Sequence, residues 1–499
     1  MTGAGTQVRA LLLLRWQMTR APGLRIAVVL TALGLGWLLQ VVVAAAGGLD
    51  DPVLGTVVEL APSVYLGFAG LAVIAPLTAG GGNELVPPDQ LVAYPVRAGT
   101  QFLGGLVLAP LNLVWLVQLV AVAALTAALT IGGSLSAGAL TSAAYVLAVT
   151  LAGQALAWTV VGLRLRRSGR RLVVAAGLCL LVGATLVVRS GRGGQVLDAS
   201  PTRYVSRAVL AGGAGDHHVW LPVTGALLVA ALAAGALGVA ACGWALRRAT
   251  DITGSGPSRV RRRPERPGAL RGLVAVDRAS VWRAPALRRG GAVLLLLPGL
   301  LAAGAAVSWD SLVVLPGLVA AGAGLLFGIN ALSLDGPGAV WLASLPHDPA
   351  LVLRSKAVVL TETVLAAVVA AALAGAARSP GTPTAGQLSA IAGSALVCTA
   401  VVVTLCLRLS VRHPHRAELR GPRDAVAPPG ALALASARLA LPTAVVGILF
   451  GAASHVNGLW PLLLALPLLA LCALSLRRSL HRYADPQVRA RIVQTVAAG

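Results

Sequence analysis

The sequence has few charged side chains and almost no lysine. Only 11% of its 499 residues are charged, whereas an average soluble domain has about 25%. Lysine occurs once, as Lys356, and Ser355 precedes it. A phosphate-binding loop of the form G-x-x-x-x-G-K-[ST] needs a glycine directly before its lysine. The chain therefore contains no such loop, and ATP binding through that motif is excluded.

Cysteine is also scarce, and its spacing excludes the common metal frameworks. None of the five cysteines belongs to a C-x-x-C motif, and each lies in or beside an apolar run. This placement is typical of buried free thiols, so we expect neither a disulfide framework nor a zinc site. The adjacent Asp216, His217 and His218 are typical of an exposed polar loop, and we expect no metal there.

Long apolar runs fill most of the chain. Hydrophobic residues make up 57% of it, and the mean hydropathy is +0.83. A helix needs about 20 mostly apolar residues to cross the bilayer core. Twelve runs approach this length: 26–46, 57–79, 105–131, 141–163, 172–189, 221–246, 291–308, 312–333, 357–377, 386–407, 433–454 and 458–476. The sequence therefore predicts an all-α polytopic membrane protein with about 12 transmembrane helices.

The positive charge is large and unevenly distributed. The formal net charge is +23, and inner loops and tails hold 34 of the 40 basic residues if the chain starts on the inner side. This asymmetry follows the positive-inside rule and predicts a multi-pass plasma-membrane protein with both termini in the cytoplasm. It also favours contact with anionic membrane lipid. Basic residues interleaved with aromatic ones, as in nucleic-acid binding, are absent, so we expect no nucleic-acid partner.

Two short motifs recur in the same order in the two halves of the chain. "RAPGLR" at 20–25 corresponds to "RAPALR" at 283–288, and 84–103 aligns without gaps with 335–354. Each pair holds the same position relative to the apolar runs. An even number of helices in each half gives a parallel repeat. We therefore predict two parallel six-helix halves, 1–246 with an N-terminal interfacial helix and 283–499 with a basic C-terminal tail, joined by the basic cytoplasmic linker 247–282.

The repeated polar segments have helix signals at both ends. Pro337 suits the first turn of a helix, and Asp335 just before it is placed to cap the free amides. Pro346 disfavours helix at the residue before it, so we expect a short helix over 338–344. Asp348, followed by proline, predicts the start of the next span. The segment from 84 has the same design, with prolines at both ends.

These segments carry a resemblance to a known family. "GGGNELVPPDQLVAYPV" at 80–96 and "GINALSLDGPGAVWLASLP" at 328–346 resemble the membrane-spanning subunits of type-2 ABC exporters, in particular the two-half actinobacterial form. The resemblance implies that 84–97 and 335–348 are coupling helices that dock on an ATP-binding subunit. It likewise implies interfacial helices at 7–20 and 274–289. The candidate coupling residues are Glu84, Asp89, Pro95, Arg97, Asp335, Trp341, Pro346 and Asp348.

The resemblance also implies a function. The chain would be the permease subunit of an exporter of an amphipathic or hydrophobic substrate, embedded in membrane lipid. A separate ATP-binding subunit, in two copies, would hold ATP and Mg²⁺. This chain would then need no cofactor and no catalytic residue, and would not itself be an enzyme.

The sequence leaves two other functions open. Twelve helices in two parallel halves also suit an ion-coupled secondary transporter, which predicts charged residues deep in the spans. The second alternative is a membrane enzyme or a non-transporting scaffold. Glu59 and Glu362 lie within apolar runs, where acids are candidates for function, and both fall near predicted span ends. The glycine pairs Gly324–Gly328 and Gly447–Gly451 suit close helix packing.

Overall fold

The computed structural model describes most of the chain, and every element in that part is helical. The described residues are 51–79, 97–108, 113–164, 167–191, 199–249, 268–304, 306–417, 429–456 and 458–497, with Gln40, Ala44, Gln195 and Ala427. The predicted interfacial helix 7–20 and most of the first coupling segment, including Glu84, Asp89 and Pro95, lie outside this part. The chain forms two compact units that divide mainly between Gly256 and Pro257, within the predicted linker.

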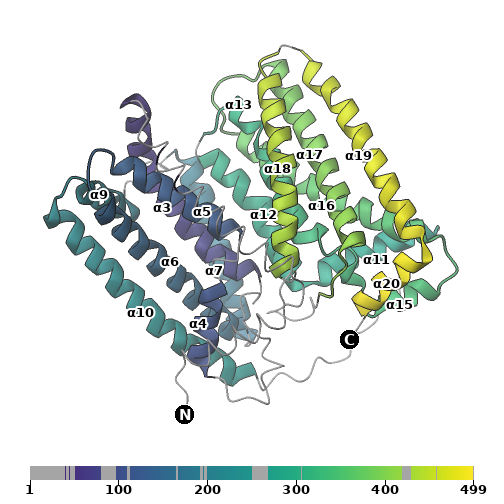
Figure 1. The fold of residues 1–499 in the computed structure, drawn as a ribbon, viewed down its shortest axis with the longest axis horizontal. Coiled ribbons are helices and arrows are strands. Elements are labelled where there is room, and N and C mark those ends of the chain that lie inside the picture. The colour runs from purple at the N-terminus through teal and green to yellow at the C-terminus, as the bar shows by residue number, and fades with distance from the viewer. Residues whose placement is uncertain are drawn as a thin grey trace. The chain divides into compact units, whose positions relative to one another are not determined.

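Unit 1 is a bundle of long helices (Figure 1). Its described helices are α3 Asp51–Ala79, α4 Ala98–Leu108, α5 Leu113–Leu129, α6 Leu135–Arg164, α7 Arg167–Arg189, α9 Thr202–Gly213 and α10 His217–Ala249. Among the described helices, α6 and α10 pack most extensively against each other, and α9 packs against both. Predicted run 105–131 is divided between α4 and α5.

Buried hydroxyl groups of unit 1 bond to one another across its helices. Tyr65 of α3 and Thr126 of α5 both lie within hydrogen-bond distance of Ser142 of α6, at 2.9 and 2.6 Å. The hydroxyl of Tyr145 donates to the backbone carbonyl of Tyr65 at 2.6 Å. A hydroxyl that leaves water without a partner costs free energy, so these bonds make a polar core compatible with a membrane interior.

Unit 2 contains the remaining helices, which begin inside the predicted linker. They are α11 Ala269–Arg283, α12 Pro285–Gly304, α13 Trp309–Leu312, α14 Leu315–Ala323, the π-turn η3 Gly324–Gly328, the 3-10 turn η4 Ser333–Asp335, α15 Gly338–Ser344, α16 Pro349–Ala376, α17 Ala385–Arg412, α18 Pro429–Ala453, α19 Trp460–Ala484 and α20 Pro486–Ala497. In this unit α11, α15 and α20 gather at one end of the bundle, while α13 lies at the other (Figure 1). The C-terminal part of the predicted linker is thus the ordered helix α11.

Eight helices in the described part are long and apolar enough to cross a membrane. They are Leu135–Arg164, His217–Arg247, Pro285–Gly304, Trp309–Asp335, Pro349–Ala376, Ala385–Arg412, Leu434–Ala453 and Trp460–Ala484. The prediction of an all-α polytopic membrane protein is confirmed. Shorter apolar helices at Val57–Val73, Gln118–Leu129 and Arg171–Val187 coincide with three more predicted runs. The count of twelve and the relation of two six-helix halves stay predictions.

The two glycine pairs differ in how tightly they pack. A Cβ at Gly324 would lie 2.6 Å from Val402 Cγ1, and one at Gly328 would lie 2.5 Å from the sulfur of Cys406. Both contacts are with α17, which therefore approaches the π-turn η3 closely. A Cβ at Gly451 would meet nothing within 4 Å. Only the first pair packs as the glycine spacing predicts at both positions.

We predict that Gly328→Ala destabilises the protein and that Gly451→Ala does not. The first substitution forces a methyl group into Cys406 and should cost about 1–3 kcal/mol, as overpacking of a filled core does. The second replaces a helical glycine in open space and should be neutral or stabilising by up to about 1 kcal/mol. Thermal unfolding of both variants in detergent checks this. Equal unfolding temperatures would show that η3 can move away from α17.

Candidate functional site

The short helix predicted between two spans of the second half is present. Helix α15 covers Gly338–Ser344, and Leu345 leaves the helical region with φ −78° and ψ 140°, as expected before Pro346. Asp348 caps the next helix, because its Oδ1 accepts a hydrogen bond from the Ala350 amide at 2.9 Å. Only a few residues therefore separate α15 from α16, which limits their independent movement.

The predicted role of Asp335 as the cap of α15 is wrong. Pro337 occupies the cap position, and no side chain caps that helix. The Asp335 side chain is instead 9% exposed and forms an ion pair with Lys356. A buried ammonium group needs anionic partners, and this need directs the carboxylate inward, away from the free amides of α15. Asp335 is consequently not a surface group that a partner could contact directly.

Lys356 lies at the centre of a buried charge cluster. Its Nζ donates to Asp277 Oδ1 at 2.6 Å and to Asp335 Oδ1 at 2.5 Å. The hydroxyl of Ser355 donates to Asp277 Oδ2 at 2.6 Å. We call Asp277, Asp335, Ser355 and Lys356 the lysine cluster. It joins α11, the turn η4 that precedes α15, and α16, so three elements meet at one ammonium group.

A second ion pair joins α11 to α16. Arg278 Nε donates to Glu362 Oε2 at 2.8 Å, and its Nη2 also contacts the same carboxylate. The hydrogen bond and the negative charge of Glu362 raise the pKa of Arg278. Neighbouring residues 277 and 278 therefore carry opposite charges, and each pairs with the opposite charge on α16. A shift of α11 along α16 would break both pairs.

These charges lie near one end of the spans. Helices α12 and α16 run in parallel, because Gly299 packs against Ala374 and Gly375 against Ala302. Pro285, the first residue of α12, lies 14 residues before Gly299. The same number of residues before the α16 contacts leads to about residue 358, which therefore lies level with the start of α12. The start of α16 thus extends about 14 Å beyond α12, at 1.5 Å per residue. Glu362 is near the middle of α16 yet close to the end of the bundle, and Lys356 is closer still.

The segment after α17 holds the loop before α15 from another side. The hydroxyl of Ser333 donates to the carbonyl oxygen of His415 at 2.6 Å. The Nε2 atom of His415 lies 3.3 Å from Oδ1 of Asn330, which is fully buried. Burial lowers the pKa of His415, although a hydrogen bond from its ring to the backbone of His413 opposes the shift. Asn330 thus belongs to the support of the turn rather than to an exposed surface.

One face of α15 is apolar and exposed. Trp341 is 74% exposed, and Val340 and Leu345 are about half exposed. The opposite side packs toward α20 across a cavity of about 160 Å³, whose walls include His347 and Arg489. In that cavity the Nε2 atom of His347 is buried and has no hydrogen-bond partner among the described residues. The helix therefore has a supported side and a free side.

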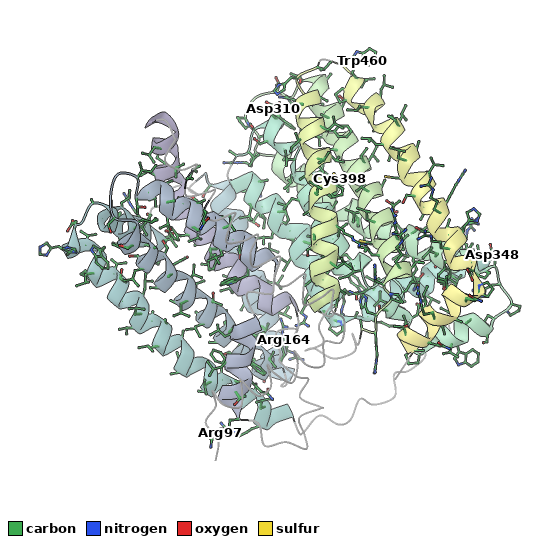
Figure 2. All side chains as sticks on the ribbon, viewed as in Figure 1. Arg97, Arg164, Asp310, Asp348, Cys398 and Trp460 are labelled. Carbon is green, nitrogen blue, oxygen red and sulfur yellow. The ribbon has the colours of Figure 1, made fainter. Side chains whose placement is uncertain are left out.

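The remaining candidate residues are more dispersed. Arg97 is exposed just before α4, and Glu59 is exposed on α3. Asp348 and Trp460 lie at opposite ends of unit 2 (Figure 2). Within the described residues no group of three or more His, Cys, Asp or Glu side chains could hold a metal ion. The buried ion pairs in the described part of unit 2 therefore lie in the lysine cluster beside α15.

The sequence predictions missed Asp277, Ser355 and Lys356. A signal was present, because the chain's single lysine stands at the edge of an apolar run. Charged residues inside membrane spans pair with one another or mark function. Their partners lie 79 and 21 residues away along the chain, and no local pattern identifies them.

We predict that Lys356→Met strongly destabilises the protein. Removal of the ammonium group leaves two buried carboxylates without a cation, which should cost about 3–5 kcal/mol. The triple variant Lys356→Met, Asp277→Asn, Asp335→Asn removes all three charges and should recover part of this loss. The matched control is Arg278→Gln with Glu362→Gln, an exposed pair worth about 1 kcal/mol or less. Thermal unfolding measures all three; a stable single variant would show that water reaches the cluster.

We also predict that stability falls as the pH drops below about 6.5, the usual pKa of histidine. Folded His415 resists protonation because its pKa is lowered by burial. The unfolded chain then binds more protons in this range, so acid favours unfolding. Unfolding of wild type and His415→Gln at about pH 7.5 and about pH 5.5 should show a smaller loss in the variant. If wild type and His415→Gln lose the same stability between these pH values, groups other than His415 cause the loss.

Comparisons of the chain with protein-family models, with curated proteins and with solved structures found no match. The resemblance to type-2 exporter permeases stays a prediction from the sequence. The function of α15 and the lysine cluster is inferred from that resemblance and from their geometry.

Proposed function

We propose that the protein is the transmembrane permease subunit of an ABC exporter and that α15 is a coupling helix. The observation that carries the proposal is a short, proline-bounded helix with an exposed Trp341, attached at both ends to the same membrane helix. Its upstream turn is bonded to α16 through Asp335 and Lys356. Its downstream end continues into α16 after Pro346. A force on α15 is thereby delivered to α16.

The lysine cluster would spread this force to a second span. Asp277 and Arg278 of α11 are bonded to α16, and α12 begins just after α11 ends. A displacement of α15 would therefore move α16, α11 and the start of α12 together. Packed interfaces of this kind have discrete arrangements instead of deforming continuously. This behaviour suits a machine that alternates between two states.

The energy source would be a separate subunit. The chain has no glycine-lysine phosphate loop, so ATP and Mg²⁺ would be held by an ATP-binding partner in two copies. One copy would dock on α15, and the other on the corresponding segment 84–97 of the first half. The mostly apolar bundle favours an amphipathic or hydrophobic substrate. The proposal places the protein in the plasma membrane with α15 facing the cytoplasm.

An ion-coupled secondary transporter is the second candidate, because charged side chains do occur within predicted spans. Coupling-ion sites of such transporters lie near the bilayer midplane. Lys356 and its partners instead lie near the end of the bundle where α12 begins. Their position favours a mechanical link at the membrane surface over an ion site within it.

We predict that Trp341→Glu strongly weakens association with the ATP-binding subunit. A buried interface tryptophan is commonly worth 2 kcal/mol or more, so affinity should fall by about 30-fold. The measurement is co-purification in detergent of the protein with any ATP-binding subunit that is encoded beside its own gene. The control is Trp460→Glu, because Trp460 is 67% exposed and lies at the other end of unit 2.

Both substitutions place a charge on an exposed site, so neither should disturb the fold, and thermal unfolding checks this. Loss of the ATP-binding subunit in Trp341→Glu alone supports the coupling-helix proposal. Retention in both variants would contradict docking on α15. A wild type that binds no such subunit would bring the secondary transporter forward.

A further inference from the structure

Arginine side chains gather at one end of unit 2 from three membrane helices. Arg408 and Arg412 stand one turn apart at the C-terminal end of α17. Arg438 lies in the first half of α18, and Arg482 is in the last turn of α19. Helices α17 and α19 end on the side where α18 begins. The four side chains therefore belong to one end of the bundle.

The packing of the helices brings these arginines near one another. Helix α17 packs extensively against both α18 and α19, which make few contacts with each other, and it lies between them in Figure 1. Arg412 interacts electrostatically with Arg408, Arg438 and Arg482. All of these interactions are repulsive, so the guanidinium groups form one positive cluster.

His413, next to Arg412, is subject to the same positive electrostatic potential. Burial lowers the pKa of His413, and the positive charges of Arg438, Arg412 and Arg491 lower it further. Among the described residues no acidic side chain contributes to this shift. The positive potential thus extends from α17 and α18 to α20.

Two of the arginines lie inside the spans themselves. Arg408 is one turn from the end of the span Ala385–Arg412, and Arg438 is about one turn from the start of the span Leu434–Ala453. Both are exposed, and no ion pair joins either of them to another described residue. Long basic side chains at this depth extend toward the membrane surface. The group that they meet there is the phosphate layer of the lipid.

Two other charged groups near this end of unit 2, Lys356 and Glu362, have partners within the protein. Lys356 has two aspartates, and Glu362 has Arg278. The arginine cluster lacks such partners in the described part of the chain, and its members repel one another. An anion from outside would relieve this repulsion. Guanidinium groups match phosphate especially well, because they donate two parallel hydrogen bonds.

We propose that Arg408, Arg412, Arg438 and Arg482 bind the phosphate of an anionic phospholipid at the ends of α17, α18 and α19. The headgroup rests on α17, and the acyl chains lie along the exposed apolar sides of the neighbouring helices. One lipid thereby links three spans whose arginine side chains repel one another at this end. The proposal requires only that unit 2 is embedded in a membrane, and it does not depend on the transport function.

The test is lipid binding by the full chain purified in an uncharged detergent. Native mass spectrometry would measure binding of phosphatidylglycerol and of phosphatidylcholine. Wild type should prefer phosphatidylglycerol. In Arg408→Gln with Arg438→Gln, binding of this lipid should weaken by about 30-fold, since each basic residue near an anionic surface contributes about a fivefold effect. The control is Arg378→Gln, because Arg378 lies just after the C-terminal end of α16, at the other end of unit 2.

Two further arms make the result decisive. Arg408→Lys with Arg438→Lys keeps both charges and should keep the preference for phosphatidylglycerol, which separates lost recognition from a damaged fold. Inorganic phosphate at the same concentration should not displace the lipid. Equal binding of the two lipids by wild type, or unchanged binding in the glutamine variant, would overturn the proposal. Complete displacement by inorganic phosphate would also overturn it, because the site would then hold a free anion.

Discussion

The arrangement around α15 depends on one buried ammonium group. Lys356 has two carboxylate partners from distant parts of the chain, Asp277 on α11 and Asp335 on the turn before α15. Transfer of an ion out of water is so unfavourable that the cluster must stay assembled once the helices pack. This requirement holds the turn η4 and the helices α11 and α16 in one relative position. Other contacts add support.

The membrane gives these polar contacts a particular value. Between apolar helices, side-chain packing alone allows sliding and rotation, because lipid tails are as apolar as the helix surfaces. Ion pairs and hydrogen bonds have directions, so they select one register. Unit 2 uses charge at the end where α15 lies, and unit 1 uses the hydroxyl groups of Tyr65, Thr126 and Ser142. Directional contacts of this kind fix the relative positions of helices whose remaining surfaces are apolar.

Local chemistry made parts of this site predictable. The ends of α15 follow from the conformational limits of proline, and the start of α16 follows from the capping geometry of Asp348. The function of Asp335 did not follow. Its sequence context offered free helix amides nearby, whereas the folded chain offered an ammonium group 21 residues away. Full charge pairing in a buried site is worth more free energy than a cap at a solvated helix end. The residues next to Asp335 in the sequence do not identify that distant partner.

Composition and hydrophobic run length by themselves determined that this is a helical membrane protein without a phosphate-binding loop, because both properties depend only on which residues occur and in what order. The limits of α15 were determined in the same way. The tertiary structure alone decided that Asp277 and Asp335 share Lys356 and that only one glycine pair packs tightly at both positions. It also brought arginines that have no ion-pair partner among the described residues from three helices to one end of unit 2. Such features arise when segments far apart in the chain meet, and the free energy of a buried charge or a filled space depends on all of them at once.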